Sequence, residues 1–222
     1  MRWLSSSLGK KYVMALTGFF LVFFALAHML GNLSTFGGAE GLNAYAEHLR
    51  AFPPLLWGFR ALLAGAAVLH LFFGLTLYLQ NKAARPVDYA CKKNERTTFS
   101  AQTMLWTGLL LLVFIVIHLV QFTFHGLLPA GAVIENTAAG HFNVFAMVAT
   151  SLNSGGVTVF YLASIVVLLL HILHGAGSFL QSLGATNENT FCAITTSGKF
   201  AAFVIALGFV LVPLSVLFGI VK

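Results

Sequence analysis

Histidines inside apolar segments are the residues of this sequence whose chemistry most needs an explanation. His171 and His174 lie in the run VLLLHILHGAG (167–177). Three other apolar runs have one histidine each in their interior: His28, His70 and His118. An imidazole is costly to place in hydrocarbon without a partner, and an ionisable residue at membrane depth marks a functional site by default. A neutral imidazole can bind a metal, and a titrating one can relay a proton.

Four of these histidines are expected at two depths. If the apolar runs are membrane helices of alternating direction, His28 and His118 each lie about 16 residues past the inner end of an outward helix, or about 24 Å. His70 and His171 each lie about 10 residues before the inner end of an inward helix, or about 15 Å. The depths therefore predict an outer pair, His28 with His118, and an inner pair, His70 with His171.

Short motifs around the four histidines repeat as well. Thr-Gly precedes a histidine at the same spacing in TGFFLVFFALAH (17–28) and TGLLLLVFIVIH (107–118). Glycine follows four residues after a histidine, on the same helix face, in HLFFG (70–74) and HILHG (171–175). The glycines of the two motifs are Gly18, Gly108, Gly74 and Gly175. The motifs of the first two apolar runs thus recur in the same order in the next two.

Two flat ligands stacked at two depths of a four-helix bundle would explain this pattern. Haem b fits, because its iron accepts two neutral imidazoles and glycine leaves room for the edge of a macrocycle. We therefore expect two low-spin haems b with four histidine ligands. Zinc or copper is a poorer match, since each level lacks a Cys or acidic partner. The alternative without a ligand is that the histidines hydrogen-bond to neighbouring helices and the glycines serve packing.

Of the two histidines in the fourth run, His171 is the expected ligand. It matches His70 in depth and in the glycine that follows it. His174 lies three residues further on, and we expect it near a haem propionate, a haem edge or a lipid headgroup. One helix cannot offer both side chains to one iron without distortion.

The elements that carry these histidines are predicted from composition. The 222 residues are 59 % hydrophobic and 8 % charged, with a mean hydropathy of +0.90, which indicates a membrane protein. Five runs are long enough to span a bilayer, which needs about 20 apolar residues. They are 12–31, 55–80, 102–125, 157–181 and 199–221. We predict one all-α membrane domain, 1–222, with a four-helix dihaem bundle and one peripheral helix.

Two other segments complete this architecture. The run FNVFAMVATSL (142–152) is too short to span and is predicted to be interfacial or re-entrant. The fifth span lacks a histidine and contains Pro213, which can kink it, so we expect it to serve packing.

The basic residues predict the orientation. Nine cations flank the spans on one side: Arg2, Lys10, Lys11, Lys82, Arg85, Lys92, Lys93, Arg96 and Lys199. Only Arg50, Arg60 and Lys222 fall on the other side. Because Lys and Arg accumulate on the cytoplasmic side, we place the N-terminus in the cytoplasm of a bacterium and the chain in its inner membrane. Cys91 and Cys192 have no metal-ligand spacing and are interpreted as incidental thiols.

Taken together, these residues resemble a known family. The chain is similar to the membrane-anchor cytochrome b subunits of succinate dehydrogenases and fumarate reductases, in the single-subunit class with five helices and two haems. The resemblance rests on GKKYVMALTGFF (9–20), AHMLGNL (27–33), GAEGLNAYAEHLR (38–50), VLHLFFGLTLYL (68–79), ARPVDY (84–89), TGLLLLVFIVIH (107–118) and HILHGAGSFLQSLG (171–184).

The resemblance implies a respiratory complex with two soluble subunits on the cytoplasmic face. One is a flavoprotein that interconverts succinate and fumarate, and the other carries iron–sulfur clusters. This chain would be their quinone-reacting subunit, passing electrons between the clusters and a membrane quinone, with menaquinone the expected type. A dimer of the heterotrimer, and either direction of the reaction, stay open. Some members have an intramembrane Glu two residues before the fourth ligand, where this chain has Leu169, so a proton path of that kind is not expected.

Polar residues near the membrane edges are candidates for the quinone and the propionates. A quinone carbonyl needs a hydrogen-bond donor, and the outer loop offers Glu40, Asn43, Glu47 and His48, although these can also simply face water. Propionates need cationic or hydroxyl partners. The candidates are Ser5–Ser7, Lys10, Lys82 and Arg85 for the inner haem, and Arg50, Arg60 and His125 for the outer one.

Two other functions fit parts of the sequence. A dihaem cytochrome b of a formate dehydrogenase or hydrogenase would use the same four ligands with different soluble partners. A haem-free transporter would use the histidines as a proton relay.

Overall fold

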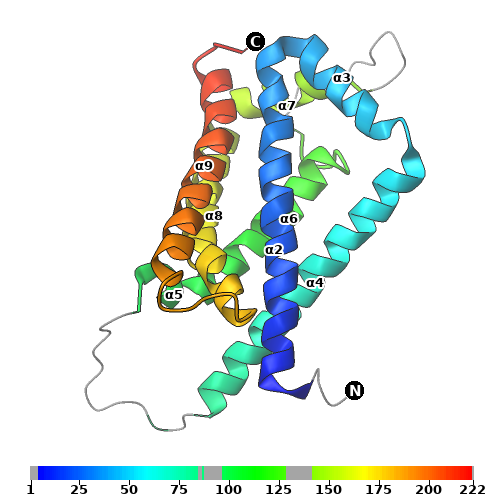
Figure 1. Cartoon of the computed structure of the whole chain (residues 1–222). Coiled ribbons are helices and arrows are strands. Elements are labelled where there is room, and N and C mark those ends of the chain that lie inside the picture. Colours follow the sequence, from blue (N-terminus) through cyan, green and yellow to red (C-terminus); the bar gives the residue numbers. More distant parts are fainter. Residues whose placement is uncertain (1–4, 85–86, 88–96, 129–141, 222) are drawn as a thin grey trace. The chain divides into compact units, whose positions relative to one another are not determined.

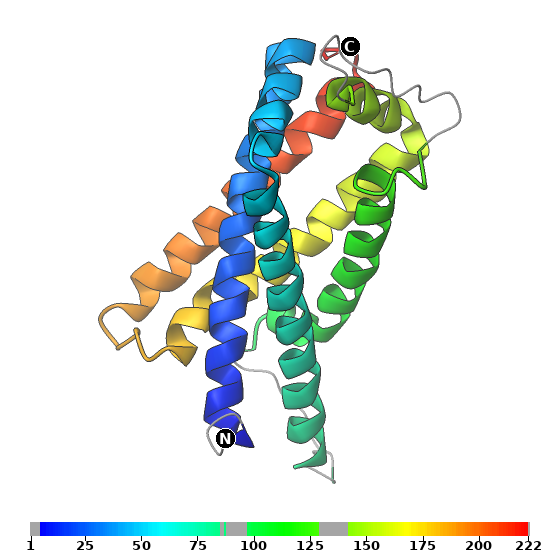
Figure 2. The same ribbon diagram turned by 90° about the vertical axis from the view of Figure 1, so that its right-hand side faces the viewer.

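The computed structural model describes residues 5–84, 87, 97–128 and 142–221. Within these ranges the chain is helical, and Figures 1 and 2 show its run of helices in two views. The long helices are α2 (Ser7–Asn32), α4 (Pro53–Ala83), α6 (Met104–Phe122), α8 (Gly155–Ser182) and α9 (Phe191–Leu217). The short elements are η1 (Leu33–Gly37), α3 (Gly38–Arg50), α5 (Phe99–Gln102) and α7 (Val144–Asn153).

The five long helices match the five predicted spans, each to within a few residues except for an earlier start of α9. Each is long and apolar enough to cross a bilayer. The chain is therefore an all-α, multi-pass membrane protein. The predicted short apolar segment forms α7, which has 10 residues and is too short to span. The helix α9 continues through Pro213 to its end.

The chain divides into two compact units. The first unit comprises Met1–Phe24, Arg60–Leu109 and Leu170–Ala202, and the second comprises Ala25–Phe59, Leu110–Leu169 and Phe203–Lys222. Each long helix contributes one part to each unit, because the sequence boundaries fall inside the helices. The first unit holds His70, His171 and His174, and the second holds His28 and His118.

Small residues set the helix packing in the first unit. A Cβ atom on Gly198 of α9 would lie 3.1 Å from the Cβ of Ala176 on α8, which leaves no space for a larger side chain. Phe19 of α2 and Phe179 of α8 pack with ring centroids 5.2 Å apart. These contacts hold α8 against both α9 and α2 near the histidines of this unit.

The second unit has a hydrophobic core in which α3, α7 and α9 meet. Its buried members are Leu42, Phe145, Leu152, Val212, Val216 and Val221. In this unit α9 buries Ile205, Ala206 and Val212 and exposes Phe203, Leu207 and Leu211. One face of the fifth span thus packs on protein, and its other face is left for lipid, as expected for a helix beside a bundle.

Two asparagines fix the start of α7. Asn143 caps the helix, its side-chain oxygen accepting from the backbone nitrogen of Ala146 at 3.0 Å. Asn43 of α3 accepts from the next orphan donor, the nitrogen of Phe145, at 3.1 Å and donates to the Asn143 side chain at 3.0 Å. The helix α3 is therefore tied to the N-terminus of α7 by hydrogen bonds.

Candidate functional site

The histidine rings come together in the pairs that the depths predict. In the first unit, His70 of α4 and His171 of α8 have ring centroids 6.3 Å apart at an interplanar angle of 67°. In the second unit, His28 of α2 and His118 of α6 have centroids 5.8 Å apart at 81°. Each pair thus joins side chains from two different helices.

The ring separations fit two imidazoles on opposite sides of one metal ion. A histidine nitrogen binds a metal at about 2 Å and the ring centre lies about 1 Å beyond, so two trans ligands have centroids about 6 Å apart. The described residues contain no group of three or more His, Cys, Asp or Glu side chains that could complete a protein-only metal site. A group that brings its own equatorial ligands, such as haem, fits a two-histidine donor set better.

Hydrogen bonds on the other ring nitrogen indicate which nitrogen of His70 is available. Its Nδ1 lies 3.2 Å from the Met14 carbonyl oxygen and 3.3 Å from the Thr17 hydroxyl. That hydroxyl already donates its single proton to the Val13 carbonyl at 2.7 Å. Both neighbours therefore accept from His70, which places the proton on Nδ1 and leaves the Nε2 lone pair for a metal.

His171 repeats this arrangement one helix pair later. Its Nδ1 lies 3.1 Å from the Thr107 hydroxyl. Thr107 donates in turn to the carbonyls of Thr103 and Met104, both at 3.1 Å. With the Thr107 proton held by its own helix, Nδ1 of His171 donates to the hydroxyl oxygen, and Nε2 is left for a metal.

The glycines of the Thr-Gly motifs lie beside the paired histidines. A Cβ on Gly18 would lie 3.0 Å from Cε1 of His70, and a Cβ on Gly108 would lie 3.3 Å from Cε1 of His171. The two glycines thus make room for the histidine rings, and room for a macrocycle edge stays a prediction. A Cβ on Gly74 would meet the methyl group of Met14 at 3.1 Å, and one on Gly175 would meet nothing within 4 Å.

His118 is held by a tyrosine and a glutamine. Its Nδ1 lies 3.2 Å from the Tyr161 hydroxyl, which donates to the Gln121 side-chain oxygen at 2.9 Å. Because that proton is used, Nδ1 of His118 is again the donor. The ring is surrounded by Phe114, Phe122 and Tyr161, at centroid distances of 5.6, 5.5 and 6.0 Å.

His28, the fourth of the paired histidines, also packs against α9. Its ring lies 5.9 Å from that of Phe209. The next residue, Met29, packs so closely on Gly208 of α9 that a Cβ there would overlap its sulfur. Asn32 donates to the His28 backbone carbonyl at 2.8 Å. The α2 backbone at His28 is thus fixed by a side-chain hydrogen bond and by close packing against α9.

The geometry favours His171 over His174 as the ligand in the fourth span. His171 meets both Thr107 and the ring of His70. His174 lies one turn further along α8 and is partly exposed.

The candidate quinone residues are placed unequally by the structure. All four lie on α3, where Glu40 and His48 are exposed and Glu47 is partly buried. The Asn43 amide hydrogen-bonds through both its oxygen and its nitrogen at the start of α7. Asn43 is thus a structural residue in this geometry, which leaves Glu40, Glu47 and His48 as the candidates.

The propionate candidates also differ in position. Lys82 is exposed in the last turn of α4, twelve residues past His70, or about 18 Å along the helix. Lys10 precedes Thr17, the neighbour of His70, by seven residues, or about 10 Å, and is the nearer cation by this measure. Arg85 lies outside the described residues. In the second unit, His125 has a positive φ of 58° and packs on Phe142 with centroids 4.9 Å apart.

The remaining propionate candidates lie near helix ends. The Ser6 side chain accepts from the backbone nitrogen of Gly9 at 3.0 Å, in the first turn of α2. Ser5 and Ser7 are exposed beside it. Arg50 is the last residue of α3, and Arg60 is exposed on α4.

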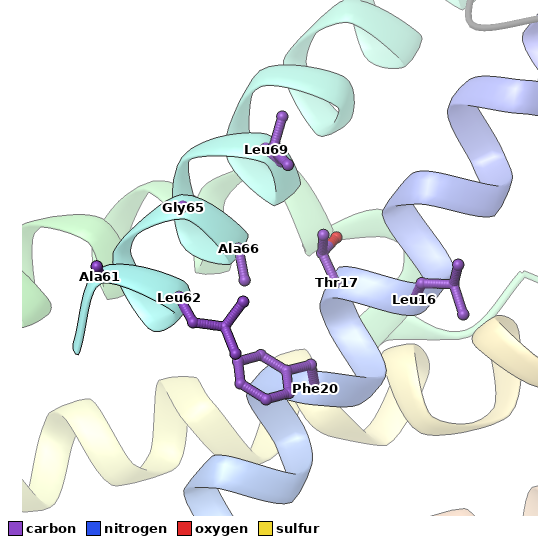
Figure 3. A pocket seen from close by; sticks show the side chains of 8 residues that line it. All are labelled: Leu16, Thr17, Phe20, Ala61, Leu62, Gly65, Ala66 and Leu69. Carbon is purple, nitrogen blue, oxygen red and sulfur yellow. The ribbon is translucent and has the colours of Figure 1, made fainter. Parts of the chain in front are cut away.

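A groove of about 400 Å³ lies between α2 and α4 in the first unit. Figure 3 shows its lining, which is apolar except for the Thr17 hydroxyl. That hydroxyl donates to Val13, so the eight lining side chains offer no free donor to a quinone carbonyl. The groove therefore suits hydrocarbon chains.

The residues that position the histidines were only partly visible in the sequence. The repeated Thr-Gly motif marked Thr17 and Thr107, although not as hydrogen-bond partners of His70 and His171. Tyr161 and Gln121 gave no sequence signal beyond being polar residues within apolar spans. Comparison of the chain with protein-family models, with curated proteins and with solved structures finds no match in any of the three.

Proposed function

We propose that this chain is a dihaem membrane-anchor cytochrome b that passes electrons between the iron–sulfur subunit of a succinate dehydrogenase or fumarate reductase and a membrane quinone. The observation that carries the dihaem part is the pairing of four histidines at ring separations of 6.3 and 5.8 Å. Three of the four have an oxygen within 3.2 Å of Nδ1, which supports a proton on Nδ1 and would leave Nε2 for iron.

His70 with His171 would hold one haem, and His28 with His118 would hold the other. A bound haem supplies a one-electron redox centre, which this chain lacks in its own side chains. The paired imidazoles would bind and orient it, and the apolar helices would exclude water. Thr17, Thr107 and Tyr161 would hold the ring protons on Nδ1, so that each Nε2 carries the lone pair that binds iron.

The succinate and quinone parts of the proposal rest on the resemblance of the sequence motifs. They predict a flavoprotein and an iron–sulfur subunit on the N-terminal side of the membrane. The chain has two cysteines, too few for cluster ligation by itself, so the dicarboxylate chemistry belongs to the partners.

The deciding experiment is a reduced-minus-oxidised visible spectrum of the purified chain with a haem count. We expect two low-spin b haems per chain. Haem-free protein that is well folded would contradict the proposal and favour the proton-relay transporter.

The purified complex separates the remaining rival. We expect a flavin-containing and an iron–sulfur subunit to copurify with the chain. A molybdenum or nickel subunit in their place would favour the cytochrome of a formate dehydrogenase or hydrogenase.

A further inference from the structure

The first unit contains the same three-residue arrangement twice. In each copy a threonine hydroxyl on one helix meets Nδ1 of a histidine on the following long helix, at 3.3 Å for Thr17 and His70 and 3.1 Å for Thr107 and His171. In each copy the glycine after the threonine lies beside the imidazole, so that a Cβ placed on it would be 3.0 Å from Cε1 of His70 or 3.3 Å from Cε1 of His171.

The hydroxyl proton has another use in both copies. Thr17 donates to the carbonyls of Val13 and Met14, and Thr107 to those of Thr103 and Met104. A hydroxyl has one proton, and while the helix carbonyls hold it the oxygen accepts from the facing imidazole nitrogen. Each threonine therefore reads as a hydrogen-bond acceptor that is fixed by its own helix.

The contact between glycine and ring adds orientation to this hydrogen bond. Each ring has the threonine oxygen at Nδ1 and the glycine beside Cε1, and both contacts limit its rotation about χ2. A ring flip would exchange Nδ1 for a carbon atom at the acceptor and would leave the buried nitrogen unpaired, which costs free energy. Thr107 is itself buried, at 4 % exposure, so water does not compete for this bond.

We propose that Thr17–Gly18 and Thr107–Gly108 are positioning elements that hold His70 and His171 in the Nδ1–H tautomer and present Nε2 of both to one haem iron. This inference rests on the proposed function. The four residues would strengthen the bond between each imidazole and iron, because an acceptor on Nδ1–H makes the imidazole a stronger electron donor. A stronger donor stabilises the oxidised iron and lowers the reduction potential of that haem.

The two histidines differ in the number of acceptors near Nδ1, so the two threonines should differ in importance. His70 has a second acceptor in the Met14 carbonyl at 3.2 Å. For His171, Thr107 is the acceptor found among the described residues. Loss of the threonine hydroxyl should therefore matter more for His171 than for His70.

The test is a spectroelectrochemical titration of the full chain carrying Thr107→Val, Thr107→Ser, Thr17→Val or Thr195→Val. Valine keeps the shape of threonine and removes the oxygen, whereas serine keeps the oxygen. Thr195 of α9 is the matched control, since its hydroxyl also bonds to backbone carbonyls of its own helix, those of Phe191 and Cys192. The haem of the first unit is identified as the one that His171→Ala removes.

We expect Thr107→Val to raise the potential of the first-unit haem and to weaken its binding about tenfold, the lower end of the effects seen when a partner of a ligand histidine is removed. Thr17→Val should shift the potential in the same direction by less. Thr107→Ser should restore the wild-type value, and the potential of the other haem should stay unchanged in all variants.

Two results would overturn the inference and can be told apart. If wild-type chain holds two haems but Thr107→Val shifts no potential more than Thr195→Val does, the positioning role is wrong and the dihaem function stands. If wild-type chain holds no haem, the proposed function and the positioning role are both wrong.

Discussion

The two units of this chain hold their paired histidines with different residues. In the first unit both histidines are held by a Thr-Gly motif, so one short motif is used twice. In the second unit His118 is held by Tyr161, which Gln121 orients, and the ring is enclosed by aromatic side chains. The first site is a duplicated arrangement, and the second is built from residues that occur once.

The difference has a physical consequence for the proposed haems. A threonine side chain is small, so it contributes an acceptor oxygen to the imidazole and little packing around it. A tyrosine adds a large ring as well as an oxygen, so it contributes packing and polarity together. We expect the two haems to have different potentials for this reason.

The largest effect should come from removing one ligand from each unit. His171→Ala should lower the haem content from two per chain to one, while His118→Ala should remove the other haem and leave the first. His174→Ala is the control for a histidine on the same helix and should keep both haems. The pyridine haemochrome assay measures the count. Loss of both haems in either ligand variant would show that the two sites do not form independently.

The next effect is steric and is specific to the first unit. Gly18→Ala places a Cβ 3.0 Å from the His70 ring, which is already held by Thr17 and Met14 and cannot easily shift. Overpacking of this kind costs about 1–3 kcal/mol. We expect weaker haem binding in the first unit and an altered low-spin electron paramagnetic resonance signal.

Gly58→Ala, on the helix α4 that carries His70, is the control for this substitution. Gly58 is exposed and a Cβ there has no neighbour within 4 Å, so the haem signal should stay as in wild type. A Gly18→Ala chain that is indistinguishable from Gly58→Ala would contradict the close approach of Gly18 to His70.

A smaller, electronic effect is expected in the second unit. Tyr161→Phe keeps the aromatic packing around His118 and removes the oxygen that accepts from Nδ1. Loss of a hydrogen bond worth about 1 kcal/mol corresponds to a rise of about 40 mV for a one-electron couple. Only the haem of the second unit should shift in a potentiometric titration. Tyr45→Phe, which removes a hydroxyl of the same unit on α3, should leave both potentials unchanged.

Sequence reasoning predicted the fold and the pairing of the histidines because both follow from regular spacing. Five apolar runs give five helices, and the rise per residue places His28 beside His118 and His70 beside His171. The partners on Nδ1 could not be predicted in the same way. Thr17 and Thr107 act on the following helix, so their role depends on helix rotation, which hydropathy does not specify. Tyr161 and Gln121 meet at one point from two helices and leave no periodic signal.

The smallest effect concerns Asn43, which could either cap α7 or bind the quinone. Its amide accepts from the nitrogen of Phe145 and donates to Asn143, so Asn43→Ala removes a second cap from α7. Lost caps cost about 0.5–2 kcal/mol, and the midpoint of thermal unfolding should fall while both haems are retained. Glu40→Ala, an exposed change on the same helix, should leave the unfolding midpoint unchanged.

The opposite result for Asn43→Ala would assign its amide to the quinone. If Asn43→Ala unfolds like wild type but loses quinone reduction in the intact complex, its amide serves the quinone and the α3–α7 hydrogen bonds contribute little. If stability falls and quinone reduction survives, the donor belongs to one of the remaining polar residues of α3. In that case the residue that caps a helix in the second unit would differ from the residue that binds the quinone. In the first unit, by contrast, the threonines that bond to their own helix are also the residues that hold the histidines.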